Sequence, residues 1–453
     1  MLYRQGKYMK NLSIKIPEKV SQILGVLKKE GYEAYAVGGC VRDSILGRTP
    51  KDWDITTSAS PFEVKRLFRR TVDTGIKHGT VTVLCGNEGY EVTTYRLDGN
   101  YEDARHPDHV EFTSSLKEDL KRRDFTINAM AYTPDTGLVD LFDGLRDLNN
   151  KIIRCVGIAD DRFDEDALRI MRAVRFAAQL GFSIEDNTVS AIKNHAERLK
   201  LISAERIRDE LIKLLMSPNP HYIKYACDYG ITAVILPEYD HIRGVAQNTR
   251  YHIYDVEEHT LKALCSIDND EILRVAMLIH DFGKPDVKTT SDKGVDSFKG
   301  HPALSAEIAD RILRRLKFDN YSRQRVVRLV RWHDIRYMPS ERNVRFALYR
   351  VGDDLFEDLL KVQYADLLAK NPALIEEETP FFREIEAIYK KVIAGGQCYS
   401  LKDLAVTGQD LIEAGLKPGP YFKEILDRML MTVIEDQDMN DREKLMSIFR
   451  YQL

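Results

Sequence analysis

Apolar residues recur at helical intervals near the start of the chain and in strand-like alternation soon afterwards. Residues 17–31 place apolar side chains at helical spacing between a proline and a glycine, which predicts an amphipathic helix. The short apolar run 34–37 has the composition of a strand. Segments 79–85 and 90–96 alternate in hydrophobicity around a GNEG turn and predict a β-hairpin.

Helical periodicity marks the rest of the chain. Residues 163–182 carry an apolar stripe at helical spacing, and residues 203–215 open with a serine at the N-cap position. Residues 311–331 form the most basic helical segment, and residues 401–436 hold two helices around a Gly/Pro turn. The pattern predicts an α+β fold, with a mixed β-sheet and helices in a head that is followed by an all-α remainder.

Composition narrows the class of protein. A chain of 453 residues is expected to form about two to four domains. It has no run of about 18 apolar residues and no apolar signal at its N-terminus, so neither a membrane span nor secretion is expected. Six cysteines without a C-x-x-C pair are typical of a reduced cytoplasmic chain. Because the net charge is −4, any RNA must bind to a local basic face.

The segment GGCVRDSILGRTPKDWD, residues 38–54, joins a glycine turn to two closely spaced carboxylates. Gly38 and Gly39 permit a tight turn whose backbone N–H groups can bind a triphosphate. Asp52 and Asp54 are two apart beside β-forming residues, so both side chains would point to one face of a strand. Two Mg²⁺ ions held there, about 3.5–4 Å apart, would clamp the attacking and leaving oxygens of a phosphoryl transfer. The order of these features favours a metal site over a solvated pair.

Glu91 lies on the second strand of the predicted hairpin. If this strand lies beside the one that carries Asp54, Glu91 becomes a third metal carboxylate; otherwise it is an ordinary solvent-facing glutamate. Residues 97–115, which follow, are polar, rich in turn formers and without periodicity, so they predict a long loop. Long loops in compact domains are usually functional or disordered.

The stretch 116–132 predicts a helix with a polar face. Asp124 and Asn128 are four apart and would share that face, where they can bind a ribose hydroxyl. Arg122 and Arg123 can reach phosphates. Charge alone also fits a helix with a solvated charged face.

Five charged residues lie off the apolar stripe of residues 163–182: Glu165, Asp166, Arg169, Arg172 and Arg175. Asp166 and Arg169 are three apart, so on a helix their side chains are neighbours. A carboxylate accepts a hydrogen bond from an exocyclic amine, and a guanidinium donates to a ring nitrogen or carbonyl, so the pair can read cytosine or adenine without a template. Arg172 and Arg175 are also expected to bind the nucleotide. The alternative is an ordinary surface ion pair.

A second set of polar residues has the character of metal ligands. These residues follow the order H…HD…H…H…D and are His259, His280, Asp281, His301, His333 and Asp366. Neutral imidazoles with a bridging aspartate suit Mn²⁺, Fe or Ni²⁺, and a metal-bound water would attack a phosphoester. The alternative is a vestigial site whose helices only scaffold RNA.

The chain resembles a known family at these motifs. The glycine turn followed by D-x-D resembles the signature of the nucleotidyltransferase superfamily that includes DNA polymerase beta. In the form GGxVRD…DxD it resembles the class II CCA-adding enzymes of the tRNA nucleotidyltransferase and poly(A) polymerase family. RRDFTINAM (122–130) resembles the ribose-selecting motif of that family, and E-D-x-x-R followed by RAVRFAAQLGF resembles its nucleobase-selecting motif.

The resemblance implies roles for single residues. Arg42 is expected to meet the triphosphate, Arg123 and Asp124 to contact the incoming nucleotide, and Asp166 with Arg169 to select its base. The D-G-x-Y-x-D-x-R-x-P segment within residues 97–115 resembles the loop that the family needs for adding the terminal A. DLFDGLRDL resembles a third, structural motif, and the order H…HD…H…H…D resembles the HD superfamily of metal-dependent phosphohydrolases.

Together these features predict an enzyme that adds C, C and A to the 3′ end of tRNA from CTP and ATP and releases pyrophosphate. The expected domains are a nucleotidyltransferase head (1–155), a neck for nucleobase and RNA (156–245), an HD body (246–370) and a tRNA-binding tail (371–453). No stable protein partner is implied. The alternatives are a poly(A) polymerase, a CC-adding enzyme, and an HD-type phosphohydrolase acting on RNA ends.

Overall fold

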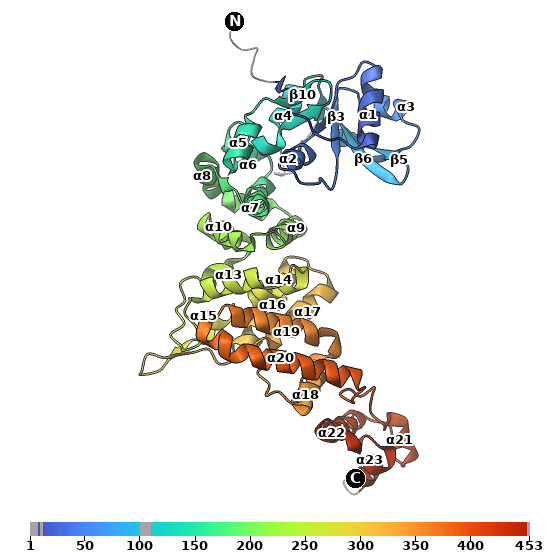
Figure 1. The fold of residues 1–453 in the computed structure, drawn as a ribbon, viewed down its shortest axis with the longest axis vertical. Coiled ribbons are helices and arrows are strands. Elements are labelled where there is room, and N and C mark those ends of the chain that lie inside the picture. The colour runs from blue at the N-terminus through green and yellow to red at the C-terminus, as the bar shows by residue number, and fades with distance from the viewer. Residues whose placement is uncertain (1–7, 10–11, 100–109, 451–453) are drawn as a thin grey trace. The chain divides into compact units, whose positions relative to one another are not determined.

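The computed structural model describes residues 8–9, 12–99 and 110–450 of the chain (Figure 1). The chain folds into two compact units, Met1–Pro237 and Glu238–Leu453. The first holds a mixed sheet and the helices that follow it, and the second is helical apart from a two-stranded hairpin. The predicted α+β class, with a mixed sheet followed by a helical remainder, is confirmed. Among the described residues, no helix is both long and apolar enough to span a bilayer.

Eight strands form one mixed sheet in the described part of the first unit. Their order across the sheet is β1 (Tyr8–Met9), β10 (Gly137–Asp140), β9 (Met130–Thr133), β2 (Ala34–Val37), β3 (Asp54–Thr57), β6 (Glu88–Thr94), β5 (Thr80–Cys85) and β4 (Thr71–Gly75). Helix α1 (Glu18–Lys29) packs on β2 and buries the apolar stripe that its periodicity predicted. The predicted hairpin is formed by β5 and β6.

The register of β3 places the acidic residues. Asp54 pairs with Val37 on the antiparallel neighbour β2, and Ile55 pairs with Val92 on the parallel neighbour β6. Glu91 therefore lies beside Asp54 on the same face of the adjacent strand. The prediction that Asp52 shares this strand is wrong, because β2 ends at Val37 and offers no pairing partner before Asp54.

Helices surround the sheet and continue beyond it. They are α2 (Gly39–Ile45), α3 (Pro61–Leu67), α4 (Leu116–Lys121), α5 (Gly144–Asn150), α6 (Ala159–Glu165), α7 (Leu168–Leu180), α8 (Asp186–His195), α9 (Ala204–Leu215), α10 (Ile223–Asp228) and α11 (Thr232–Ile235). α7 is buried along most of its length and packs on α9. Its Phe176 meets Phe125 edge to face, with ring centroids 5.8 Å apart, which joins the helices to the sheet-bearing part.

The helix predicted over 116–132 is wrong beyond Lys121. Phe125 is fully buried and pairs as an isolated bridge with Cys155, and the next N–H, of Thr126, donates to the carbonyl of Arg154 at 2.9 Å. The backbone bonds of this stretch are thus satisfied by another segment and by a single 3₁₀ turn over Thr126–Asn128, rather than by a continuous α-helix.

The continuous helix predicted over 163–182 is also wrong. The backbone is extended at Asp166, with φ −140°, and the carboxylate Oδ1 of Asp166 accepts the N–H of Leu168 at 3.0 Å. Asp166 therefore caps the start of α7 instead of lying on a helix with Arg169.

Short paired strands occur outside the main sheet. They are β7 (Arg96–Asp98) with β8 (Val110–Phe112), β11 (Ile152–Ile153) with β12 (Ser183–Ile184), and β13 (Thr289–Thr290) with β14 (Asp296–Ser297). β7 and β8 pair the two ends of the segment 97–115, which was predicted as a loop throughout. Residues 100–109 lie outside the described residues, and so does most of the D-G-x-Y-x-D-x-R-x-P motif.

The second unit has a larger and a smaller group of helices. The larger group is α12 (Pro237–His241), α13 (Val256–Ser266), α14 (Glu271–Ile279), α15 (Lys284–Val287), α16 (His301–Arg315), α17 (Asn320–Trp332), α18 (Glu341–Val351), α19 (Asp353–Leu368) and α20 (Pro372–Ala394). The smaller group, α21 (Gly408–Glu413), α22 (Tyr421–Glu435) and α23 (Arg442–Arg450), packs around an apolar core of its own.

The basic segment 311–331 spans two helices rather than one, because the chain turns at Lys317, where φ is 56°. Its arginines are largely paired with carboxylates. Arg323 pairs with Asp310, and Arg325 with Asp358 at 2.7 Å. These internal ion pairs neutralise much of the positive charge that the sequence places on this segment.

Candidate active site

A glycine turn joins β2 to α2 at the centre of the sheet. Gly38 has φ 80°, which favours glycine, and a Cβ at this position would lie 3.0 Å from Nη1 of Arg123. A Cβ at Gly39 would lie 3.6 Å from Nη2 of Arg42. The turn therefore brings its backbone close to two guanidinium groups, which is the setting that a polyphosphate needs.

Three carboxylates gather beside this turn. Asp54 opens β3, Glu91 lies beside it on β6, and Asp52 precedes the strand. Burial raises the pKa of Asp54, Arg123 opposes that rise, and Asp52 adds to it. Burial also raises the pKa of Glu91, which the charges of Asp54 and Asp52 raise further. A divalent cation would relieve the repulsion among these groups, so their chemistry fits a site for hard cations.

A buried network connects the turn to the helices. The carboxylate of Asp124 accepts hydrogen bonds from Arg172 Nε at 2.9 Å and from Asn128 Nδ2 at 3.1 Å. The amide oxygen of Asn128 accepts a hydrogen bond from Arg42 Nη1 at 2.6 Å, and Arg42 Nε donates to Asp43 at 2.8 Å. The residues predicted to contact the nucleotide are thus linked to one another through side chains.

The residues predicted to read the base have other partners. Asp166 accepts a hydrogen bond from Arg206 Nη2 at 3.0 Å, while Arg169 Nη2 donates to the backbone carbonyl of Arg122 at 3.0 Å. Arg169 also pairs with Glu165.

Arg175 forms a buried ion pair with Glu210 of α9, and its guanidinium lies 3.8 Å from the ring centroid of Phe176. Sequence reasoning missed Glu210 and Arg206, because both lie in the helix predicted over 203–215, where the sequence analysis noted only the N-cap serine.

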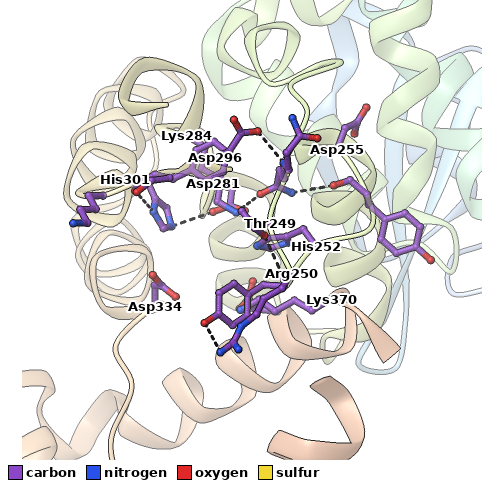
Figure 2. A pocket seen from close by; sticks show the side chains of 18 of the residues that line it. Thr249, Arg250, His252, Asp255, Asp281, Lys284, Asp296, His301, Asp334 and Lys370 are labelled. Carbon is purple, nitrogen blue, oxygen red and sulfur yellow. Dashed lines mark hydrogen bonds and ion pairs between the residues drawn. The ribbon is translucent and has the colours of Figure 1, made fainter. Parts of the chain in front are cut away.

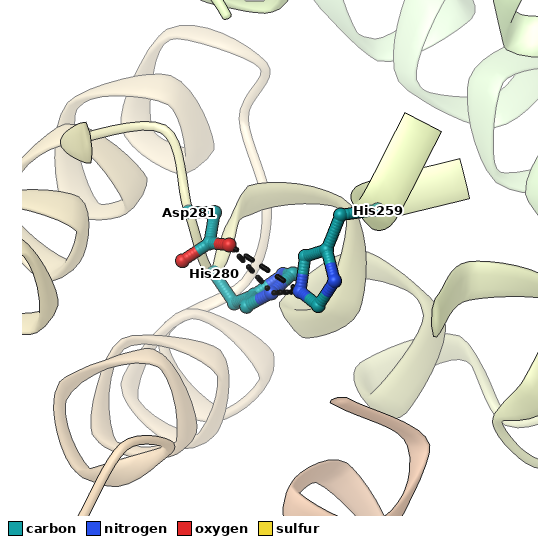
Figure 3. A group of neighbouring side chains, drawn as sticks. All are labelled: His259, His280 and Asp281. Carbon is teal, nitrogen blue, oxygen red and sulfur yellow. Dashed lines mark hydrogen bonds and ion pairs between the residues drawn. The ribbon is translucent and has the colours of Figure 1, made fainter. Parts of the chain in front are cut away.

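A second cluster of polar residues lies in the second unit. Figure 3 shows His259, from α13, with His280 and Asp281 at the end of α14. The Nε2 atoms of the two histidines are 3.4 Å apart, and Asp281 Oδ2 lies 3.2 Å from that of His280 and 3.5 Å from that of His259. Asp366 of α19 completes this group, with Oδ1 3.0 Å from His259 Nε2.

Asp281 also contributes to a neighbouring group. Its Oδ1 lies 3.3 Å from Nε2 of His301 and 3.7 Å from Nε2 of His333, and the two imidazole nitrogens are 3.2 Å apart. All six predicted ligands are buried and brought together, with Asp281 shared between the two groups. This arrangement suits two metal ions bridged by one carboxylate.

The backbone fixes the orientation of the four histidines. Nδ1 lies near a carbonyl oxygen in each: Met277 for His280 at 2.7 Å, Phe298 for His301 at 2.8 Å, Val330 for His333 at 2.6 Å, and Ala369 for His259 at 3.1 Å. Because Nδ1 carries the proton that these carbonyls accept, Nε2 of each neutral ring points its lone pair at the cluster. Two lone pairs about 3.3 Å apart repel unless a cation or proton lies between them, so this donor set fits metal ions.

Two lysines balance the negative charge of the aspartate ligands. Lys284 Nζ lies 2.7 Å from Asp281, and Lys370 Nζ lies 2.7 Å from Asp366. Burial alone would raise the pKa of both carboxylates, but the neighbouring histidines and lysines hold it well below the ordinary value. Burial would lower the pKa of His280, yet Asp281 and Asp366 raise it to about 9, so in the absence of metal a proton is favoured at this imidazole.

A pocket of about 1210 Å³ opens beside the cluster, and Figure 2 shows side chains that line it. Asp281, His301, Lys284 and Lys370 lie on its walls. His252, which the sequence analysis did not select, also lines it, and its ring meets that of His259 edge-on at 4.8 Å between centroids. Burial is the main cause that lowers the pKa of His252 to about 2.

The sheet, the glycine turn and the adjoining carboxylates form the arrangement expected of a nucleotidyltransferase. Three family models match the chain: the poly A polymerase head domain over residues 34–154, the RNA and SrmB-binding site of polymerase A over 181–242, and tRNA nucleotidyltransferase domain 2 over 303–449. Residues 243–302, with four of the six clustered ligands, lie between the last two matches.

Whole-chain relatives narrow the class to one family. A CCA-adding enzyme of Lactobacillus delbrueckii subsp. bulgaricus is 37% identical over 436 residues, which cover 95% of this chain and 97% of that protein. One from Lacticaseibacillus paracasei is 38% identical over 428 residues, 94% of each. The crystal structure of the Bacillus stearothermophilus CCA-adding enzyme in complex with CTP matches with a TM-score of 0.72 and 32% identity, covering 96% of this chain and 98% of that one. The chain belongs to the CCA-adding enzyme family.

Proposed function

We propose that the protein adds C, C and A to the 3′ end of tRNA from CTP and ATP, with release of pyrophosphate, and that Asp52 and Asp54 are its catalytic carboxylates. Support comes from relatives that match nearly the whole chain. The observation that carries the assignment of the site is the placement of Asp54, opposite the glycine turn and beside Glu91. This arrangement puts three carboxylates next to a turn that can bind a triphosphate.

In this proposal the carboxylates of Asp52, Asp54 and Glu91 hold Mg²⁺. Bound there, Mg²⁺ would lower the pKa of the attacking 3′ hydroxyl and neutralise charge on the phosphates. The backbone N–H groups at Gly38 and Gly39 bind the triphosphate and orient the α-phosphate for in-line attack.

Side chains around the turn supply the remaining contacts. Arg42 and Arg123 contact the phosphates, and Asp124 and Asn128 contact the ribose. Asp166 and Arg169 select the base, and Arg172 and Arg175 also bind the nucleotide. In the structure Arg172 pairs with Asp124, and Arg175 pairs with Glu210 of α9. Asp166 pairs with Arg206 and Arg169 with Glu165, so an incoming nucleotide exchanges polar partners with these side chains rather than entering an apolar pocket.

The test is to sequence the 3′ ends of tRNA transcripts that lack CCA after incubation with the protein, Mg²⁺, CTP and ATP. Ends that stop at CCA support the proposal. Ends that stop at CC would indicate a CC-adding enzyme, and long A tails a poly(A) polymerase. Deleting residues 100–109 should convert CCA ends to CC ends if this segment serves the addition of A.

The histidine cluster favours a second function. We infer that the second unit binds two transition-metal ions, with Mn²⁺, Ni²⁺ or Fe as candidates, and hydrolyses phosphoesters, including RNA ends that carry a 3′ or cyclic phosphate. The supporting observation is the inward orientation of four imidazole Nε2 atoms around a shared carboxylate. His280→Ala should abolish hydrolysis and spare nucleotide addition, whereas Asp52→Ala should do the reverse. Failure to hydrolyse any phosphoester with added Mn²⁺ or Ni²⁺ would contradict this function.

We place both activities in the cytoplasm. All six cysteines lie among the described residues and are outside disulfides, as expected for a chain that works in a reducing compartment.

A further inference from the structure

A buried carboxylate behind the candidate active site holds two arginines and the central strand together. Asp119 lies on α4, and its side chain is fully buried. Its Oδ1 accepts hydrogen bonds from Arg122 Nε at 3.0 Å and Nη2 at 2.8 Å. Its Oδ2 accepts the hydroxyl of Thr56 at 3.0 Å and lies 3.6 Å from Arg123 Nη2.

Two of these contacts lead directly to the glycine turn and the carboxylates. Thr56 lies two residues after Asp54 on β3, so its hydrogen bond to Asp119 restrains the strand that carries this carboxylate. Arg123 extends from Asp119 toward the turn, where its Nη1 lies 3.0 Å from the Cβ position of Gly38. Asp119 thereby connects the metal-binding strand to the turn through side chains alone.

Arg123 interacts electrostatically with two acids, Asp54 and Asp119. Its charge lowers the pKa of Asp54, and it lies 3.6 Å from Asp119. Burial would raise the pKa of Asp119, but Arg122 and Arg123 hold it below the ordinary value, so this carboxylate is charged at neutral pH. Without the charge of Asp119, Coulomb attraction would draw the guanidinium toward Asp54, where it would compete with a divalent cation.

We propose that Asp119 is a positioning residue for nucleotidyl transfer. It holds the guanidinium of Arg123 at the glycine turn, where it meets the triphosphate, and keeps it away from Asp54, so that this carboxylate remains available to the cation. The inference rests on the proposed function of the head. It applies equally to CTP and ATP, because the contact is to phosphate and not to the base.

The first experiment compares Asp119→Asn, which keeps the shape and removes the charge, with the wild-type full-length protein. The KM values for CTP and ATP should rise together, and the Mg²⁺ concentration for half-maximal rate should rise by about 10-fold or more. Which nucleotides are added should not change. Thr56→Val, which removes only the hydroxyl, should raise the KM values and the required Mg²⁺ concentration by a smaller factor.

Asp147→Asn is the matched control. Asp147 is also a buried carboxylate of the first unit, and it accepts hydrogen bonds from the hydroxyl of Thr126 at 2.7 Å and from Arg154 Nε at 3.0 Å. Its loss should lower the melting temperature as Asp119→Asn does, but leave KM and the Mg²⁺ requirement unchanged. Equal Mg²⁺ requirements for the two variants would overturn the proposal and reduce Asp119 to a structural role.

A double-mutant cycle with Arg123→Lys supplies the second measurement. If Asp119 acts through Arg123, the double variant should lose little more affinity for the nucleotide than Arg123→Lys alone, whereas additive losses would contradict the proposal. Calorimetric titration with CTP and Mg²⁺, without tRNA, gives the same comparison without turnover. If the wild-type protein binds CTP but extends no tRNA, the proposed function is contradicted. The calorimetric comparison of the variants would then still test whether Asp119 acts through Arg123.

Discussion

The carboxylate of Asp124 and the guanidinium of Arg172 form an ion pair that joins the segment after α4 to the base-reading helix α7. Asp124 is buried, and about a third of the Arg172 side chain is exposed. Under the proposed function, Asp124 contacts the ribose and α7 carries the residues that select the base. The pair is then a direct side-chain link between ribose binding and base selection.

Asp124→Asn should lower the free energy of unfolding by about 2 kcal/mol, since it removes a charge-assisted hydrogen bond from a partly solvated arginine. The stabilisation that the Asp124 carboxylate provides depends on pH in a definite direction. Burial would raise the pKa of Asp124, but Arg172 and Asn128 hold it well below the ordinary value. The stabilisation is therefore fully present above pH about 4 and is lost as the pH falls further. In thermal unfolding, the difference in melting temperature between wild type and variant should become smaller below pH about 4. A difference that stays constant with pH would contradict a stabilising ion pair at Asp124.

Glu91→Gln should reduce the rate of nucleotide addition about 10- to 100-fold if Glu91 is the third metal carboxylate. The loss should be partly recovered at higher Mg²⁺ concentration, because the weakened site can still be filled. Glu88→Gln is the control, since Glu88 lies on the same strand but pairs with Lys19 at 3.1 Å, away from Asp54. A normal rate and Mg²⁺ requirement in Glu91→Gln would show that this residue is an ordinary surface glutamate.

The number of bound metal ions should depend on which ligand is removed from the second unit. Asp281→Ala should abolish binding of both ions, because this carboxylate contacts both histidine groups. His301→Ala should leave one ion, as should His259→Ala. Elemental analysis after dialysis against Mn²⁺ or Ni²⁺ measures the stoichiometry, and His241→Ala, which alters an exposed histidine, serves as the control. Loss of a single ion from Asp281→Ala would contradict a bridged pair.

Asp166→Ala should impair the choice of nucleotide more than its rate of addition. The alanine frees Arg206 and removes the cap of α7, so the base-reading groups lose their fixed orientation. Sequencing of 3′ ends should reveal U or G at positions that are C or A with the wild type. Asp164→Ala removes an exposed carboxylate two residues earlier and should add C, C and A faithfully; equal infidelity in the two variants would argue against a role for Asp166.

The sequence predicted the local features well where a pattern decides the structure by itself. The alternation of residues 79–96 predicted the hairpin, and the order of the histidines and aspartates predicted a cluster whose first and last ligands, His259 and Asp366, are 107 residues apart. The parallel pairing of β3 and β6, on which the role of Glu91 depends, was left open, because register between distant strands is a tertiary property.

The two helix predictions that were wrong, over 116–132 and 163–182, failed for a common physical reason. The stretch after Lys121 leaves the helix because Phe125 finds its partner on a distant segment, and α7 begins after Asp166 because a side chain caps it. Asp119 and His252 escaped notice for the same reason. Neither stands in a recognisable motif, and their surroundings are made by residues that the fold brings in from elsewhere.

The parallel register of β3 and β6 constrains how this region can vary in length. A one-residue insertion in β6 between Glu91 and Val92, which pairs with Ile55 of β3, would turn the Glu91 side chain to the opposite face of the sheet, whereas the turn at residues 86–87 can grow without disturbing it. Among homologous head domains, insertions and deletions should therefore occur in the turn and be rare in the strand. An engineered tag or sensor peptide placed at that turn should leave catalysis intact.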